Sequence, residues 1–214
     1  MSCLALEFGW RDVVPSATED PGSRCRGGTG QWPRGTVIGH SGAPVRAVVF
    51  DMGGVLVRLG PLTAILGDDA VAEEDFWPRW LRSEVVRNFE MGRCGPEEFG
   101  RHLVAEFDLP FDGEELVRRF AAWPQGLFDG AAELVGSLEV EVAVLSNTNA
   151  LHWQNQLDAD IVRLLFDRRY LSFELGMAKP DLDIFRFVAD DLFIDLGAAP
   201  SSILFLDDNQ VNVD

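Results

Sequence analysis

The spacing of hydrophobic positions changes along the chain, and these changes predict its elements. The run 47–50 is apolar at every position, which is typical of a strand that is buried on both faces of a parallel sheet, and further strands are expected over 140–145, 169–173 and 202–206. Between them, apolar residues recur at helical spacing over 129–138, within 150–166 and over 180–191. This alternation predicts an α/β fold in which helices wrap a parallel sheet.

The segment 65–125 has a helical pattern. Phe99, Leu103 and Phe107 recur every four residues, and 116, 117 and 120 continue at helical spacing. The run 95–98, Gly-Pro-Glu-Glu, is a plausible helix start. We therefore assign 61–125 to a small helical bundle inserted into a core made of 46–60 and 126–214.

The first part of the chain differs in composition from the rest. Residues 1–46 contain eight glycines and four prolines, and their charges nearly balance, with five basic and four acidic residues. The remainder carries 13 basic and 31 acidic residues. We expect 1–45 to be a leader with little or no order.

Charge and cysteine content restrict the partners. The net charge of -17 argues against nucleic acid and against an anionic membrane surface, because both bind clustered Lys and Arg. No apolar run approaches the roughly 18 to 20 residues that a membrane span needs. Cys3, Cys25 and Cys94 are odd in number and widely spaced, which favours reduced thiols. We expect a globular cytoplasmic protein; the sequence does not indicate its oligomeric state.

Carboxylates follow two of the predicted strands. Asp51 comes directly after the run 47–50 and is followed by Gly53 and Gly54, and its position at the carboxyl end of a buried strand suggests a nucleophile. Asp207 and Asp208 follow the run 202–206. Two adjacent anions repel unless protons or a cation relieve them, and Mg²⁺ is a suitable hard cation.

Polar residues of other types follow the remaining strands. Ser146 and Asn147 begin a Ser-Asn-Thr-Asn run that supplies a hydroxyl and backbone N–H groups for an anion, although such a run alone is more often a helix cap. Lys179 is the only lysine of the chain and precedes a helix that Pro180 is suited to start. A lone lysine at a helix start is usually solvated.

The order and spacing of these motifs resemble the haloacid dehalogenase-like (HAD) hydrolase superfamily over residues 46–214. The matching segments are FDMGGVL, LSNTN, LGMAKP and FLDDN. A spacing of 95 positions from Asp51 to Ser146 matches members with a helical cap inserted between the first two motifs. The segments look most like phosphatases of sugar phosphates, including the alpha-glucose-1-phosphate type, and like the phosphatase domain fused to some epoxide hydrolases.

The resemblance implies a Rossmann-like core, a Mg²⁺ cofactor, a small phosphorylated metabolite as substrate and an aspartyl-phosphate intermediate. It assigns the site residues as follows: Asp51 and Lys179 to catalysis; Ser146, Asn147 and Lys179 to the substrate phosphate; and Asp51, Gly53, Asp207 and Asp208 to the metal.

Two features depart from the superfamily pattern. Gly53 stands where many phosphatases of this superfamily have an acid–base aspartate, which predicts slow turnover or a preference for good leaving groups. His152 is a possible substitute proton carrier, although an ordinary polar role is the stronger interpretation.

In the cap, Trp80, Glu90 and Arg93 are candidate specificity residues, with core and surface roles favoured.

The second departure is the ending, six residues beyond Asp208, because similar proteins continue with a helix and a further strand. We therefore expect a fragment whose sheet has an exposed edge.

Three functions remain open: a Mg²⁺-dependent phosphatase, which the motifs favour; a metal-free 2-haloacid dehalogenase, which Asp207 and Asp208 argue against; and an inactive or truncated domain that only binds ligands.

Overall fold

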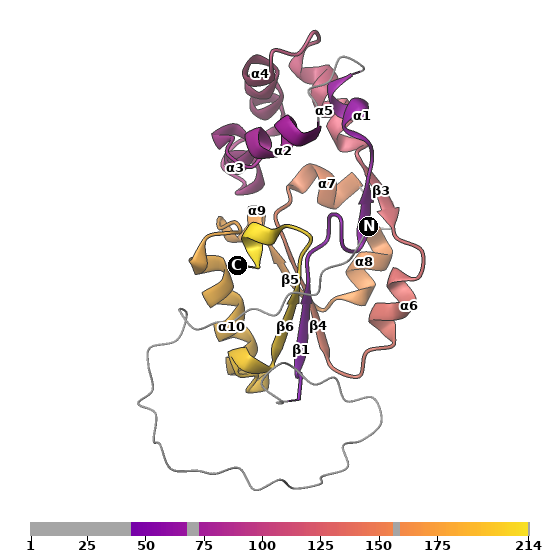
Figure 1. Cartoon of the computed structure of the whole chain (residues 1–214), viewed down its shortest axis with the longest axis vertical. Helices are drawn as coiled ribbons and strands as arrows, with labels where there is room; N and C mark the ends of the chain where they lie inside the picture. The colour runs from indigo at the N-terminus through magenta and orange to yellow at the C-terminus, as the bar shows by residue number, and fades with distance from the viewer. Residues whose placement is uncertain (1–43, 68–72, 156–158, 214) are drawn as a thin grey trace, which may run out of the picture.

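A four-stranded parallel sheet forms the lower half of the molecule in a computed structural model that describes residues 44–67, 73–155 and 159–213 (Figure 1). Its order is β5-β4-β1-β6, with β1 at Ala47–Phe50, β4 at Glu141–Ser146, β5 at Arg168–Leu171 and β6 at Ile203–Leu206. In register, Phe50 lies opposite Val144 of β4 and Leu206 of β6. The predicted parallel sheet is thus confirmed, and its strands end at one edge.

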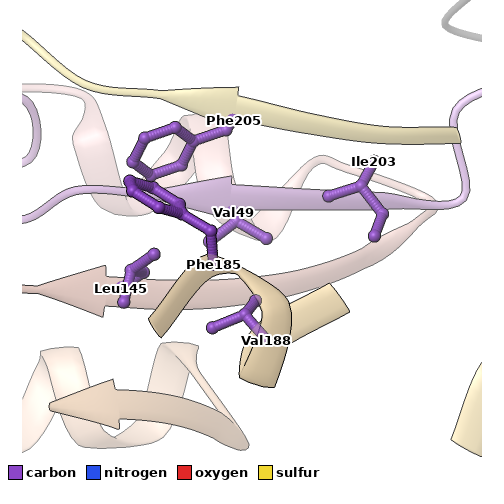
Figure 2. Close-up of a pocket in the computed structure, with 6 residues that line it drawn as sticks. All are labelled: Val49, Leu145, Phe185, Val188, Ile203 and Phe205. Carbon is purple, nitrogen blue, oxygen red and sulfur yellow. The ribbon is translucent and has the colours of Figure 1, made fainter. Parts of the chain in front are cut away.

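Helices cover both faces of the sheet. On one face lies α10, Leu182–Leu196, whose Phe185 and Val188 pack against Val49 of β1 and Leu145 of β4 (Figure 2). On the other face lie α6, Ala131–Gly136, and α8, Ala159–Leu165. Alternate residues of β1 enter the two cores, which explains why its run is apolar at every position.

Some boundaries differ from the predicted ones. α10 begins at Leu182, after the N-cap Asp181, because a turn in which the N–H of Asp181 donates to the carbonyl of Ala178 occupies the preceding residues. It continues to Leu196 and stops at Gly197, whose φ of +63° is left-handed. The strand expected over 169–173 ends at 171, where the short helix α9, Ser172–Leu175, begins.

Five helices form a second layer above the sheet, which we call the α1–α5 layer (Figure 1). They are α1 at Leu62–Leu66, α2 at Glu73–Trp80, α3 at Glu84–Glu90, α4 at Pro96–Phe107 and α5 at Gly113–Ala121. Their shared core is rich in aromatic residues, among them Phe76, Phe99 and Phe120. A two-stranded antiparallel sheet joins this layer to the rest: β2, Val57–Leu59, and β3, Pro124–Leu127, which the hydrophobic pattern does not predict.

Two contacts fix the α1–α5 layer over the carboxyl edge of the large sheet. The hydroxyl of Ser172, at the start of α9, donates to the carbonyl of Glu90 over 2.6 Å. Nearby, Gly92 has a φ of +69°, and a Cβ there would lie 2.5 Å from the carbonyl oxygen of Phe173, so only glycine permits this approach. The turn after α3 is therefore held against the sheet half.

The remaining elements are short. α7, Ala150–Asn155, lies between the sheet edge and the α1–α5 layer (Figure 1), and the 3₁₀ turns η1 and η2 cover Pro200–Ser202 and Gln210–Asn212. Nearly all of the expected leader, 1–43, falls outside the described residues. Within the described part, β6 forms one edge of the sheet, and no helix is long and apolar enough to cross a membrane.

The contact between α4 and α5 yields a stability prediction. A Cβ on Gly100 would lie 2.4 Å from the carbonyl oxygen of Gly113 and 2.8 Å from Cγ2 of Val117. Gly100→Ala should therefore lower the free energy of unfolding by about 1–3 kcal/mol through overpacking. In Gly136→Ala, the matched control, a Cβ meets nothing within 4 Å, and helix propensity should leave stability equal or slightly higher. Urea unfolding checks this; equal stability of both variants would contradict the packing argument.

Candidate active site

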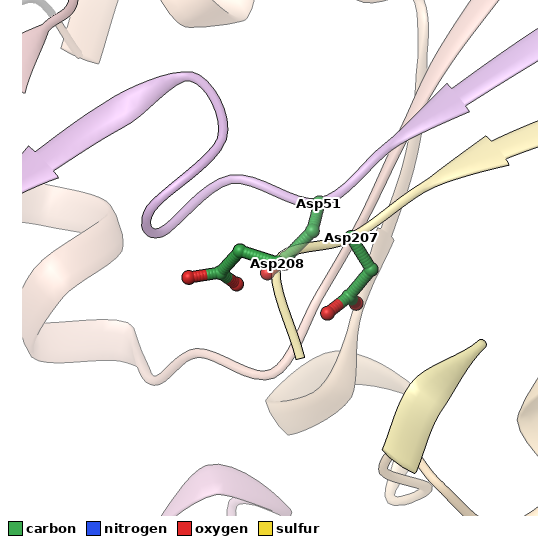
Figure 3. Close-up of side chains that lie close together, drawn as sticks. All are labelled: Asp51, Asp207 and Asp208. Atoms are coloured by element: carbon green, nitrogen blue, oxygen red, sulfur yellow. The ribbon is translucent and has the colours of Figure 1, made fainter. Parts of the chain in front are cut away.

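Three carboxylates meet where β1 and β6 end. Asp51 follows β1, and its N–H donates to the carbonyl of Leu206 over 2.8 Å, so the two chain ends stay together as they leave the sheet. Asp207 and Asp208 follow β6 directly. One oxygen from each of the three carboxylates lies within 4.8 Å of the others (Figure 3). Because β1 and β6 are neighbours, the sheet itself brings these side chains together.

The Lys179 ammonium lies between two of these carboxylates. Its Nζ is 2.9 Å from Oδ1 of Asp51 and 2.5 Å from Oδ2 of Asp207, and its side chain is 1% exposed. The side chain of Asn147 holds the lysine backbone at both polar groups: Nδ2 donates to the Lys179 carbonyl over 2.9 Å, and Oδ1 accepts from the Lys179 N–H over 2.8 Å. The ends of β1, β4 and β6 and the loop before α10 are thereby joined.

Asp207 is oriented by a second set of donors. Nδ2 of Asn212 lies 3.0 Å from both of its carboxylate oxygens, and the backbone N–H of Asn209 donates to Oδ1 over 2.8 Å. With Lys179 this makes Asp207 the most firmly held of the three acids. Asn212 belongs to η2, so this 3₁₀ turn shapes the site.

Negative charge exceeds positive charge in this cluster. Burial, and then Asp207, raises the pKa of Asp51 to about 6, although Lys179 acts in the opposite direction. Burial and Asp207 also raise the pKa of Asp208. Burial alone would lower the pKa of Lys179, but Asp51 and Asp207 outweigh it, and the net direction is upward. One ammonium therefore faces three carboxylates, and an added cation would relieve the remaining repulsion.

The donor set fits Mg²⁺. Carboxylate oxygens are the ligands that a hard divalent cation prefers. Gly54 has a φ of +78°, and a Cβ there would lie 2.1 Å from Oδ2 of Asp208, so glycine leaves the space that this carboxylate occupies. Asp51, Asp207 and Asp208 are the residues that would hold the ion, and Gly53 lines the same space.

The predicted site residues share one cavity of about 870 Å³ between the sheet edge and the α1–α5 layer. All seven line it: Asp51, Gly53, Ser146, Asn147, Lys179, Asp207 and Asp208. The Ser-Asn-Thr-Asn run is only in part a helix cap. Oδ1 of Asn149 caps α7 by accepting from the N–H of His152, whereas the N–H of Thr148 donates to Ser172. Ser146 ends β4 and is buried at the cavity wall.

His152 is held in a structural role. Its Nε2 lies 2.7 Å from the carbonyl oxygen of Phe120, and because a carbonyl only accepts, Nε2 carries the proton. Nδ1 faces Nδ2 of Asn149 at 3.4 Å. Burial lowers the pKa of His152 to about 4, although the Phe120 carbonyl raises it. The ring is thus neutral at pH 7 and links α7 to the α1–α5 layer, which supports the ordinary role over that of proton carrier.

Only two of the three specificity candidates from the α1–α5 layer lie at the cavity. Trp80 and Glu90 line the cavity, whereas Arg93 is exposed and does not line it. Burial raises the pKa of Glu90 to about 7; Lys179 and Arg87 lower it, and Asp51 raises it. The carboxyl group of Glu90 can therefore gain or lose a proton near neutral pH.

On one face of α3, sequence reasoning found Glu90 but missed the residues beside it. Ser83, Val86, Arg87 and Glu90 all line the cavity, and their spacing of three and four residues is the signal that places them on one helix face. Arg87 forms an ion pair with Asp181, the N-cap of α10, and so joins this face to the loop that carries Lys179.

Known sequences show which family this chain is similar to. The sequence model of the haloacid dehalogenase-like hydrolases matches residues 45–214. A sesquiterpene phosphatase from Aspergillus oryzae is 30% identical over 173 residues, which cover 78% of this chain and 83% of that protein. A D-ribitol-5-phosphate phosphatase from Bacteroides thetaiotaomicron is 24% identical over 180 residues, which cover 79% of this chain and 85% of that protein.

Solved structures share the fold. An HAD family enzyme from Bacteroides thetaiotaomicron, in complex with magnesium and inorganic phosphate, has a TM-score of 0.61 and 25% identity over 78% of this chain and 87% of its own. A dehalogenase with a TM-score of 0.55 and 22% identity, over 78% of each chain, is alike in fold alone. With the parallel sheet and the family match over 45–214, the chain belongs to the haloacid dehalogenase-like hydrolases.

Proposed function

We propose that this hydrolase is a Mg²⁺-dependent phosphatase of small phosphorylated metabolites that works through an aspartyl-phosphate. The observation that carries the proposal is the cluster at the ends of β1 and β6, where Asp51 is paired with a buried ammonium beside two further carboxylates. The relatives named as phosphatases and the magnesium and phosphate complex of a structural neighbour support the same reaction.

In this proposal, Asp51 attacks the phosphorus atom, the P–O bond to the alcohol breaks, and water then hydrolyses the aspartyl-phosphate. A phosphate dianion repels a carboxylate, so the attack needs fixed positive charge. Lys179 supplies one such charge, and Ser146 with the N–H of Asn147 orients the phosphoryl group. Asp51, Asp207, Asp208 and the Gly53 carbonyl would hold Mg²⁺, whose positive charge would offset the charge of the phosphate.

Glu90 is the residue that would transfer the proton in this reaction. Gly53 has no acidic side chain, and both ring nitrogens of His152 are engaged within the protein. Glu90 lines the cavity, and burial raises its pKa to about 7, so it can be protonated when the alcohol leaves and ionised when water attacks. The α1–α5 layer would then act as a cap that contributes to the chemistry.

Sugar phosphates are the substrates expected from the motifs, but the two relatives named as phosphatases differ in the organic part of their substrates, a sesquiterpene and a ribitol. The net charge of -17 still argues against nucleic acid as a partner. A cytoplasmic location fits the composition.

The two alternatives have distinct signatures. A 2-haloacid dehalogenase needs no metal, and the three clustered carboxylates argue against it. Chloride release from 2-chloropropionate without Mg²⁺ would favour it. A domain that only binds ligands would bind phosphate esters but would not hydrolyse any of them.

The proposed reaction predicts loss of activity on removal of either the nucleophile or the metal. Phosphate release from p-nitrophenyl phosphate should require Mg²⁺, stop with EDTA and return when Mg²⁺ is added in excess. Asp51→Asn should lower kcat by at least about 10³-fold, because an amide cannot form the covalent intermediate. Asp129→Asn, an exposed carboxylate away from the cavity, is the matched control and should keep full activity. Undiminished turnover by Asp51→Asn would refute the mechanism.

Gly53 permits a gain-of-function test. A Cβ at this position would lie 3.5 Å from the nearest atom, Cδ1 of Leu59, which is an ordinary contact, and the φ is not left-handed, so the backbone accepts a side chain there. Gly53→Asp should raise activity on esters with poor leaving groups, by up to about 10²-fold, and change aryl phosphates little. A panel of alkyl and aryl phosphates measures this. An unchanged ratio between the two classes would show that the lack of a carboxyl group at position 53 does not limit proton transfer to the leaving group.

Glu90 predicts a pH dependence. A proton donor acts in its protonated form, so activity on alkyl phosphates should fall as pH rises through the Glu90 pKa of about 7. Glu90→Gln should lower kcat on these esters by about 10-fold or more and abolish that decline. Arg93→Gln is the control from the same turn, outside the cavity, and should keep the wild-type profile. A decline that persists in Glu90→Gln assigns the proton to another group.

A further inference from the structure

The wall of the cavity that faces the acidic cluster is mainly apolar. Leu59 of β2 and the α1–α5 layer supply this wall, with Trp77, Trp80, Leu81, Phe120 and Trp123. At its rim, Leu81 is 57% exposed, Leu59 37% and Val211 59%. Large apolar side chains that stay exposed while lining one cavity are suited to an apolar ligand.

The aromatic residues of this wall present ring surfaces. Nε1 of Trp123 donates to the carbonyl of Gly60 over 2.6 Å, so the polar atom of this ring is already bonded. The Trp77 ring stacks on that of Trp123 with centroids 6.1 Å apart, and the Trp80 ring lies 5.7 Å from that of Phe120. Rings held by such contacts offer a rigid apolar surface to a bound molecule.

Most of the polar side chains in the cavity already have partners in the protein. The hydroxyl of Ser83 donates to Glu106, Nε of Arg82 donates to the carbonyl of Pro78, and Arg87 pairs with Asp181. Asn147 is bonded to the Lys179 backbone, and His152 to Phe120. A sugar or polyol loses hydrogen bonds to water on entering a site and needs protein partners in return. These walls offer it few.

From this division of the cavity we propose that the substrate is the phosphate monoester of a largely hydrocarbon alcohol, with the phosphate at the acidic cluster and the hydrocarbon part against the aromatic wall. The inference rests on the proposed phosphatase function and departs from the sugar phosphates expected from the motifs. A cavity of about 870 Å³ accommodates an organic group well beyond the phosphate itself.

A series of primary alkyl phosphates tests the inference, because its members share one leaving-group chemistry. Ethyl, butyl, hexyl and octyl phosphate are compared with ribitol-5-phosphate and glucose-6-phosphate, with Mg²⁺ and below the micelle concentration of the octyl ester. kcat/KM should rise about two- to fourfold for each added methylene group that the wall covers, and octyl phosphate should exceed both polyol phosphates by at least 10-fold. A flat or falling series, or a preference for either polyol phosphate, would overturn the inference.

A matched pair of surface variants locates the effect. Leu81→Asn places a polar group on the apolar rim and should lower the ratio of kcat/KM for octyl over butyl phosphate at least threefold. Leu134→Asn is the control: Leu134 is 56% exposed, like Leu81, but lies on α6 away from the cavity. It should leave the ratio unchanged. Equal ratios in both variants would show that the chain-length effect arises elsewhere, and would overturn the assignment of this wall.

Activity on p-nitrophenyl phosphate distinguishes a wrong substrate class from a wrong reaction. Turnover of this ester that depends on Asp51 and Mg²⁺, together with a flat alkyl series, would reject the hydrocarbon substrate and keep the phosphatase. If no ester releases phosphate, both proposals are overturned.

Discussion

The site depends on one buried ammonium between two carboxylates. Removing either partner of a buried ion pair leaves an uncompensated charge in a poorly solvated place, which typically costs several kcal/mol. Lys179 therefore does more than neutralise Asp51, because it also fixes the distance between the ends of β1 and β6. As the only lysine in a chain with 18 basic residues, it is a compact point charge where arginine would bring a planar fork.

The fold is arranged so that this lysine has little freedom. Both polar groups of its backbone are bonded to Asn147 at the end of β4, and Asp207 is held by Asn212 and by the N–H of Asn209. The side-chain amides of Asn147 and Asn212, which carry no charge themselves, thus hold Lys179 and Asp207 in place. Such outer contacts determine how well a site is organised before its ligand arrives.

The sequence predicts the sheet and its polar edge well, because a strand buried on both faces leaves a continuous apolar run and its end is visible as the first polar residue. Asp51 and Asp207 are found in this way. The hydrogen bonds from Asn147 to Lys179 and from His152 to Phe120 are not predictable from the sequence, because each joins residues about 30 positions apart through side-chain geometry. The tautomer of His152 follows from the second of these bonds. Arg93 is exposed and does not line the cavity, in agreement with the surface role that the sequence analysis favours over a role in specificity.

Glu90, the proposed proton donor, belongs to the α1–α5 layer and not to the sheet half that carries the other proposed site residues. Glu90 keeps its place through its own carbonyl, bonded to Ser172, and through the close approach of Gly92 to Phe173. Both contacts belong to the same turn and both reach α9, which follows β5 directly. Asp51, Asp207 and Asp208 lie at the ends of β1 and β6, whereas Glu90, the proposed proton donor, ends α3 in the α1–α5 layer. The aromatic wall proposed for the organic part of the substrate belongs to the same layer as Glu90, so under both proposals one placement of this layer over the sheet serves binding and proton transfer.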